Sequence, residues 1–142
     1  MPSRNDNGLA STLAAMDRVK QTAKEAAMQR LIKGAEDTAD LQRQLVAVDD
    51  GDLRDSIAVT LPGQSTPAYS QPGGSTVAGE NQVLVTAGNS DVRYPHHVEH
   101  GTIKAQAKPF FFVAYRLLAD KTKRATASAF TRAAKKAWNQ KS

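Results

Sequence analysis

The sequence predicts an α+β fold: a long N-terminal helix, a small mainly antiparallel sheet that holds a long flexible hairpin loop, and a C-terminal helix packed on the sheet. Apolar residues recur at spacings of three and four near both ends of the chain, which is the period of a helix. Between them lie two short stretches in which apolar and polar residues alternate, which is the period of a strand. The length of 142 residues suits one domain spanning residues 1–142, with a frayed N-terminus at 1–10.

The N-terminal helix is expected from about Ser11 to Leu45. Its apolar face consists of Leu13, Met16, Ala23, Ala27, Leu31, Thr38, Leu41 and Leu45. This stripe is thin and rich in alanine, so we expect the helix to need a partner, either the C-terminal helix or another chain. Gly34 lies inside the pattern and costs about 1 kcal/mol relative to alanine, which favours a kink or break there.

An acidic turn at residues 49–52 precedes the first expected strand, at 57–61. Its carboxylates suggest a calcium loop, but Thr60 stands where that loop carries its final glutamate, so we expect a turn that caps the next element. The second strand is expected at 82–87. Residues 62–81 between the strands contain three prolines and four glycines. They are expected to form a flexible loop, or an arm that orders against a neighbouring subunit with Tyr69 as its anchor.

The C-terminal helix is expected to begin at Pro109, because a missing N–H and a fixed φ suit a first helical position. The buried stripe predicted for it consists of Phe111, Tyr115, Leu118, Thr122, Ala125, Ala129, Ala133 and Ala137. The bulky residues at its start predict a core made of Phe110, Phe111, Phe112 and Tyr115. The alanine-rich remainder predicts close packing against another helix.

All three histidines of the chain lie within five positions, and His96, Glu99 and His100 match the HxxEH pattern of inverted zinc peptidases. Gly101 would end a helix there after about one turn, and the sequence has neither a cysteine nor a fourth histidine to complete a site, so zinc hydrolysis is the weaker interpretation. We expect Glu99 to accept backbone N–H bonds in a tight turn for which Gly101 supplies the φ angle. The role of His96, His97 and His100 is left open.

Two groups of residues carry a resemblance to a known family. The first comprises Gly51, Leu53, Ser56 and Ile57, and the second comprises Tyr94, Val98, Glu99, Gly101, Thr102, Pro109 and Phe110. In this order and spacing they resemble the tailed-phage gene-product-ten-like family of head–tail connector or tail-completion proteins, and with the two long helices the likeness covers nearly the whole chain. The resemblance implies a structural virion protein with no catalytic, metal or cofactor residues. Its implied location is the head–tail junction or tail end of the virion, and the host cytoplasm during assembly.

Charge is divided along the chain. Residues from Lys104 onward carry ten Lys or Arg and one acid, a net charge of +9, whereas the preceding residues carry nine bases and thirteen acids, a net charge of −4. Opposite charges favour contacts between identical subunits, so we expect a homo-oligomeric ring. The resemblance implies that this ring surrounds the DNA channel and contacts other neck and tail proteins. The candidate contacts to packaged DNA or acidic partners are Lys121, Arg124, Arg132 and Lys135. The alternative function is a small basic nucleic-acid-binding module that uses this row.

Other functional classes find little support in the sequence. It contains no cysteine, which excludes disulfide and thiol chemistry. Its apolar runs are shorter than the roughly 20 residues of a membrane span, so no membrane contact is expected. No nucleophile stands beside a base and an orienting partner, and the glycines do not form a phosphate-binding loop, so we do not expect an enzyme.

Overall fold

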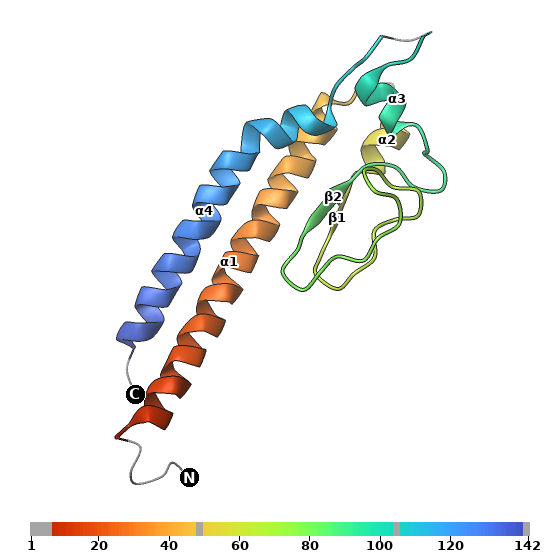
Figure 1. Ribbon diagram of the computed structural model, residues 1–142. Helices are drawn as coiled ribbons and strands as arrows, with labels where there is room; N and C mark the ends of the chain where they lie inside the picture. Colours follow the sequence, from red (N-terminus) through yellow and green to blue (C-terminus); the bar gives the residue numbers. More distant parts are fainter. Residues whose placement is uncertain (1–6, 48–49, 104–105, 141–142) are drawn as a thin grey trace. The chain divides into compact units, whose positions relative to one another are not determined.

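The computed structural model describes residues 7–47, 50–103 and 106–140, without the side chain of His96. In chain order its elements are α1 (Leu9–Leu45), α2 (Gly51–Asp55), β1 (Ala58–Thr60), β2 (Leu84–Thr86), α3 (Pro95–His100) and α4 (Phe111–Asn139) (Figure 1). This order confirms the α+β fold with a long helix at each end and a small antiparallel sheet. No helix within the described ranges combines the length and the apolar character that a membrane crossing requires.

The contacts of the chain group into two compact units. Unit 1 comprises Met1–Leu31 and Thr122–Ser142, and unit 2 comprises Ile32–Lys121. Both long helices therefore contribute to both units. The expectation of a single domain stays a prediction.

Unit 1 is a pair of helical segments, the first part of α1 and the last part of α4, which run antiparallel (Figure 1). Ala23 on α1 is fully buried, and Ala137 on α4 is nearly so. Their neighbours on the inner faces, Ala27 and Ala133, are half-buried. Small side chains let two helices approach closely, so the predicted packing of the alanine-rich end of α4 against another helix is confirmed.

The expected break at Gly34 is wrong, because α1 continues through this residue as one helix. Gly34 is buried, and its carbonyl also accepts a hydrogen bond of 2.8 Å from the Thr38 hydroxyl. Ala35 and Ala39 are buried on the same stretch of helix. Burial of this face therefore offsets the weak helix propensity of glycine.

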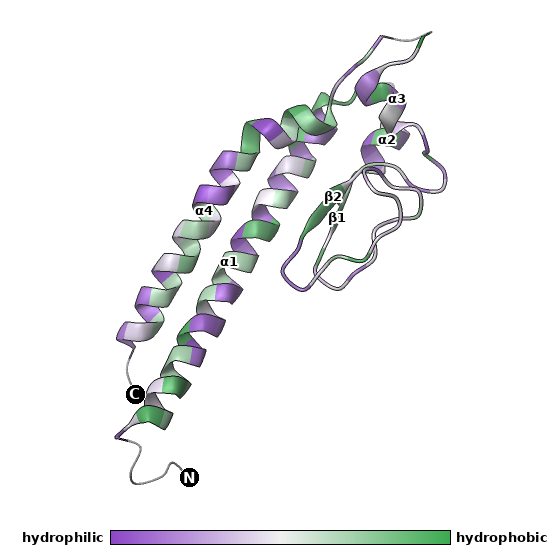
Figure 2. Cartoon of the chain, in the orientation of Figure 1, coloured by the Kyte–Doolittle hydropathy of each residue, from purple (hydrophilic) through white to green (hydrophobic). Residues whose placement is uncertain are grey.

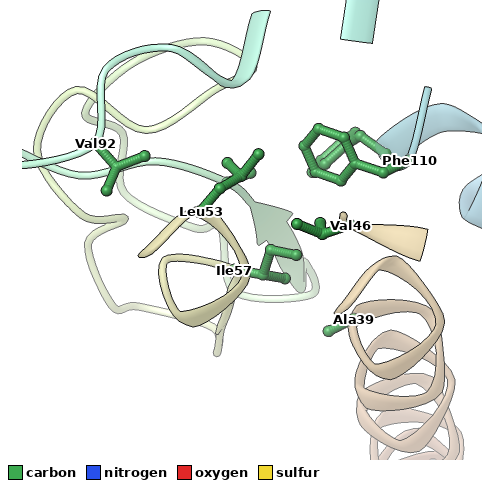
Figure 3. Packing of buried hydrophobic residues seen from close by; sticks show 8 residues of the cluster. Ala39, Val46, Leu53, Ile57, Val92 and Phe110 are labelled. Carbon is green, nitrogen blue, oxygen red and sulfur yellow. The ribbon is translucent and has the colours of Figure 1, made fainter. Parts of the chain in front are cut away.

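The core of unit 2 collects apolar side chains from elements that are far apart in the sequence (Figure 3). Its members are Ala39, Val46, Leu53, Ile57, Ala87, Val92, Phe110 and Phe111, and the partly buried Val59, Val85 and Val98 pack against them. Phe110 and Leu53 are the largest fully buried apolar side chains among the described residues. The start of α4 thus shares one core with the sheet and with α2.

The predicted core around the aromatic run is correct for only two of its four members. Phe110 and Phe111 are buried, whereas Phe112 is 37% exposed and Tyr115 is 58% exposed. Ala114 is fully buried and shows which side of α4 faces inward. Successive residues of a helix are separated by about 100°, so the face that carries Phe111 and Ala114 turns Phe112 and Tyr115 toward solvent.

The sheet consists of β1 and β2, which pair antiparallel with Val59 opposite Val85. Residues 62–81 connect the two strands, as expected for the hairpin loop. Main-chain hydrogen bonds run along this loop, for example from Gly63 N to Ala78 O at 2.9 Å and from Thr66 N to Thr76 O at 2.7 Å. The flexibility of the loop stays a prediction.

Candidate functional site

The best-defined junction in unit 2 is the contact between α3 and the start of α4. Glu99 lies near the end of α3 and is 8% exposed. Its Oε2 accepts hydrogen bonds from the backbone N–H groups of Phe110 at 2.8 Å and Phe111 at 2.9 Å, and its Oε1 accepts one from Phe112 at 3.1 Å. The carboxylate therefore satisfies three N–H groups that the first turn of α4 leaves without helical partners.

Glu99 is held in its ionised form. Burial opposes ionisation of the carboxyl group, but the three backbone donors and the nearby His100 outweigh it and lower the pKa of Glu99 below its ordinary value of 4.5. The positive end of the α4 dipole favours the same charge. The expectation that Glu99 accepts backbone N–H bonds is confirmed, although the donors belong to the next helix and not to the turn after α3.

Gly101 ends α3 as expected. Its φ of 77° lies in the left-handed region, and its N–H donates to His97 O at 2.7 Å. α3 is therefore only six residues long. Among the described residues, no group of three histidine or acidic side chains is placed to hold a metal ion. Since both oxygens of Glu99 bind backbone donors, this carboxylate is not positioned to activate a water molecule as a zinc peptidase requires.

A small apolar cavity of about 140 Å³ lies beside this junction. It is lined by Gln71, Pro72, Ala87, Pro95, Glu99, His100, Phe110, Phe111 and Phe112. One wall of the cavity is aromatic, and Phe111 packs edge-on against Phe110 and Phe112 with ring centroids 6.1 and 5.2 Å apart. With the Glu99 oxygens engaged by backbone donors, the cavity offers a mainly apolar surface.

A second junction joins α2 to the segment that follows β2. The Ser56 hydroxyl donates to Leu53 O at 2.6 Å and accepts from Gly88 N at 2.9 Å. Gly88 has a φ of 96°, and a Cβ there would lie 2.9 Å from both Pro95 Cγ and Val92 O. Only glycine fits this position. This close approach was not predicted from the sequence, although a glycine followed by an asparagine is typical of a turn.

Tyr94 links the start of α3 to the acidic turn. Its hydroxyl donates a hydrogen bond of 2.7 Å to Asp50 Oδ1. This bond, together with partial burial and the charges of Asp50 and Asp52, raises the pKa of Tyr94 to about 12. Tyr94 of the second motif thus contacts Asp50, the residue that precedes the first motif.

The remaining motif residues have different surroundings. Leu53, Ile57 and Phe110 are core residues, and Val98 packs against the core. Gly51 is half-buried at the start of α2, whereas Thr102 and Pro109 are exposed. Pro109 lies two positions before the first residue of α4, so its predicted place in the first turn is wrong. The first turn of α4 is instead capped by the Glu99 carboxylate.

The candidate contact residues lie at the surface of their elements. Lys121, Arg124, Arg132 and Lys135 are all exposed on α4. Tyr69 is 53% exposed at a φ of 62°, and the Arg93 guanidinium carbon lies 3.8 Å from its ring centroid. Contacts of these residues with DNA or with a neighbouring subunit stay predictions. The role of the three histidines stays open.

One buried and one partly buried polar contact were not predicted from the sequence. Gln42 on α1 is 1% exposed, and its Nε2 donates to Phe111 O at 3.2 Å. Arg43 Nη2 donates to Ile57 O at 2.9 Å. Both bonds tie the end of α1 to the core of unit 2. A glutamine and an arginine on a predicted helix look like solvated residues, so their sequence context gives no signal of these contacts.

Comparison with models of known protein families gives a match. Residues 10–101 match the family model described as bacteriophage HK97-gp10, putative tail-component. No curated protein and no solved structure matches the chain significantly. The matched range includes most of α1, α2, the sheet and α3 up to Gly101. The chain therefore belongs to the HK97-gp10-like family of bacteriophage tail components.

Proposed function

We propose that this chain is a structural protein of a tailed-phage virion that completes the tail or joins it to the head, as a closed ring around the DNA channel. The observation that carries this proposal is the family match, which spans residues 10–101 and describes a tail component. The geometry of the Glu99 junction supports a structural role, because the one buried carboxylate of the motif is used to fix α4.

The proposal of a ring is based on the different net charges of the two units. Unit 1 contains eleven Lys and Arg and three acids, a net charge of +8, whereas unit 2 contains eight bases and eleven acids, a net charge of −3. A surface of each sign on one chain favours head-to-tail contacts between copies, and such contacts close into a ring when their rotation permits. Neighbouring neck and tail proteins would then bind the two faces of the ring.

The experiment is a deletion of the gene in a phage that encodes this chain, followed by electron microscopy of the lysate. A tail-completion or joining protein predicts DNA-filled heads and separate tails that fail to join, with infectivity restored by supplying the protein from a plasmid. Normal, infectious particles after deletion would contradict the proposal. Particles without any tail would assign the protein to an earlier step of tail assembly.

A second function, binding of nucleic acid as an isolated protein, is favoured by one observation. The part of α4 in unit 1 carries basic residues and no acid, and its Arg132 and Lys135 are exposed. If the four candidate residues contact phosphates, the logarithm of the binding constant should fall with the logarithm of salt concentration at a slope of roughly −3 to −4. Weak binding with a shallow slope would favour the neck protein.

A further inference from the structure

The outer end of unit 1 carries large apolar side chains that α4 does not cover. Leu9, Leu13 and Met16 are 58, 51 and 54% exposed on the first two turns of α1, and Trp138 in the last turn of α4 is 47% exposed. Figure 1 shows the first turns of α1 beyond the last turn of α4, and Figure 2 shows apolar colouring on the first turns of α1. We call these four residues the tip of unit 1.

The tip residues of α1 lie on a helix face that becomes buried farther along α1. Leu9, Leu13 and Met16 follow one another at spacings of four and three, and Ala23 comes seven residues after Met16 on the same face. Ala23 is fully buried in the helical pair. The same stripe is therefore covered where it carries alanine and uncovered where it carries leucine and methionine. Grouped exposed apolar side chains of this size are typical of protein–protein contacts.

The net charge of unit 1 decides which kind of partner surface fits the tip. Unit 1 has a net charge of +8, so packing of one tip against the same tip of another copy would bring like charges together. Unit 2, with its net charge of −3, is the region of opposite sign in this chain. A partner surface for the tip should join acidic groups to an exposed aromatic or apolar side chain.

Unit 2 contains one surface of this kind at α2. Asp52 and Asp55 are exposed there, and Asp50 accepts the hydrogen bond from the Tyr94 hydroxyl, which holds the 36% exposed ring of Tyr94 beside them. We call Asp50, Asp52, Asp55 and Tyr94 the acidic patch. Arg54 pairs with Asp55, so three acids stand against one base in this patch. Asp37 and Asp40 on α1 are instead matched one to one by Lys33 and Arg43.

We propose that the tip of unit 1 in one copy binds the acidic patch of unit 2 in the next copy, so that each subunit uses two different surfaces. This inference rests on the proposed ring and identifies the contact that would build it. The contact is heterologous, because the surface given by one copy differs from the surface offered by its neighbour. Leu13 and Met16 supply its apolar centre, and Asp52 and Asp55 are opposite in sign to unit 1, whose net charge is +8.

The test uses the full-length, nuclease-treated protein and two double variants. The tip variant carries Leu13→Glu and Met16→Glu, and the patch variant carries Asp52→Asn and Asp55→Asn.

Light scattering after size exclusion should show each variant as a monomer at concentrations where the wild type is a closed oligomer. An equimolar mixture of the two should give a dimer of twice the monomer mass and no larger species, because each pair then retains one intact contact. The matched control is Leu117→Glu, at an exposed position of α4, and this variant should keep the wild-type oligomer mass.

Each other outcome contradicts a distinct statement. If both double variants keep the wild-type mass, the tip and the patch are not the contact, although the ring and the virion role stand. If both are monomers but their mixture gives no dimer, the two surfaces do not pair with each other. A wild-type protein that stays monomeric at every concentration overturns both this contact and the preformed ring. Circular dichroism of each variant establishes that the helices are retained.

Discussion

Unit 1 and unit 2 are stabilised in different ways. Unit 1 buries alanines between two helices. Its bulky apolar residues are largely uncovered, since Phe130 is 41% exposed and Trp138 is 47% exposed. Unit 2 buries Phe110 and Leu53 and fixes its elements with long-range bonds to the Glu99 carboxylate. The comparison indicates that the large, fully buried apolar side chains belong to unit 2, whereas the two helices of unit 1 pack through alanine.

The largest expected effect concerns the bulky core of unit 2. Phe110→Ala should lower the free energy of unfolding by about 4 kcal/mol, because it removes a 1% exposed ring and leaves a cavity. The matched change in unit 1, Phe130→Ala, should cost less than about 1 kcal/mol, since that ring is partly solvated. Urea denaturation measures both. Equal losses in the two variants would contradict the assignment of the core to unit 2.

The next effect concerns the cap of α4. Glu99→Ala should cost about 2 to 3 kcal/mol, because three N–H groups at the start of α4 lose a charged acceptor. Glu99→Gln keeps one acceptor oxygen and should cost less. The exposed Glu80→Ala is the control, with an expected change within about 0.5 kcal/mol. The same denaturation curves test this order, and a neutral Glu99→Ala would disprove the capping role.

The pH dependence of stability tests the charge of Glu99. Its pKa is lowered on folding, so its contribution is complete above the unfolded value of 4.5 and is lost as the pH falls through the lower folded value. The free energy of unfolding should therefore decrease more steeply below pH 4.5 in the wild type than in Glu99→Gln. Parallel pH profiles for the two proteins would contradict the ionised cap.

A smaller effect is expected in the alanine-lined pair. Ala23→Leu should cost about 2 kcal/mol, because the extra atoms have no space where Ala23 is fully buried between the helices. Ala14→Leu on the exposed side of α1 is the matched control and should change stability by less than about 0.5 kcal/mol. If both substitutions are tolerated equally, the two helices of unit 1 are not closely packed.

The smallest effect belongs to the Tyr94–Asp50 bond at the surface of unit 2. The pKa of Tyr94 is about 12 in the folded chain and 10.0 in the unfolded chain, so the neutral phenol is favoured by folding. Its contribution is complete below pH 10 and is lost as the pH rises toward 12. Spectroscopic titration at the phenolate absorption band should show one of the three tyrosines titrating late. Tyr94→Phe should remove that late step.

Much of this fold was accessible from local patterns. The helical period predicted α1 to within two residues of its observed start, and alternation predicted both strands. The preference of a carboxylate for N–H donors predicted that Glu99 accepts backbone N–H bonds, although not that the donors belong to α4. Gly101 predicted the end of α3. These features depend on residues close together in the sequence, or on one chemical preference, and so can be read from the chain alone.

The features that were missed depend on distant partners. Gln42 contacts Phe111, 69 residues away, and Ser56 contacts Gly88, 32 residues away. Neither residue type reveals its partner. Tyr115 was expected in the core because an aromatic at helical spacing is usually buried, but the rotation of α4 was set by Ala114 and Phe111. Small residues at close contacts carry a weak hydrophobic signal although they determine which face packs.

The most direct test of the account is the mass of the purified wild-type protein, measured by light scattering across a series of protein and salt concentrations. Opposite charges on the two units predict a closed oligomer of fixed copy number at low salt that dissociates as ionic strength rises and screening increases. A monomer under every condition, or an oligomer whose mass is insensitive to salt, would contradict the claim that charged surfaces of the two units build the ring.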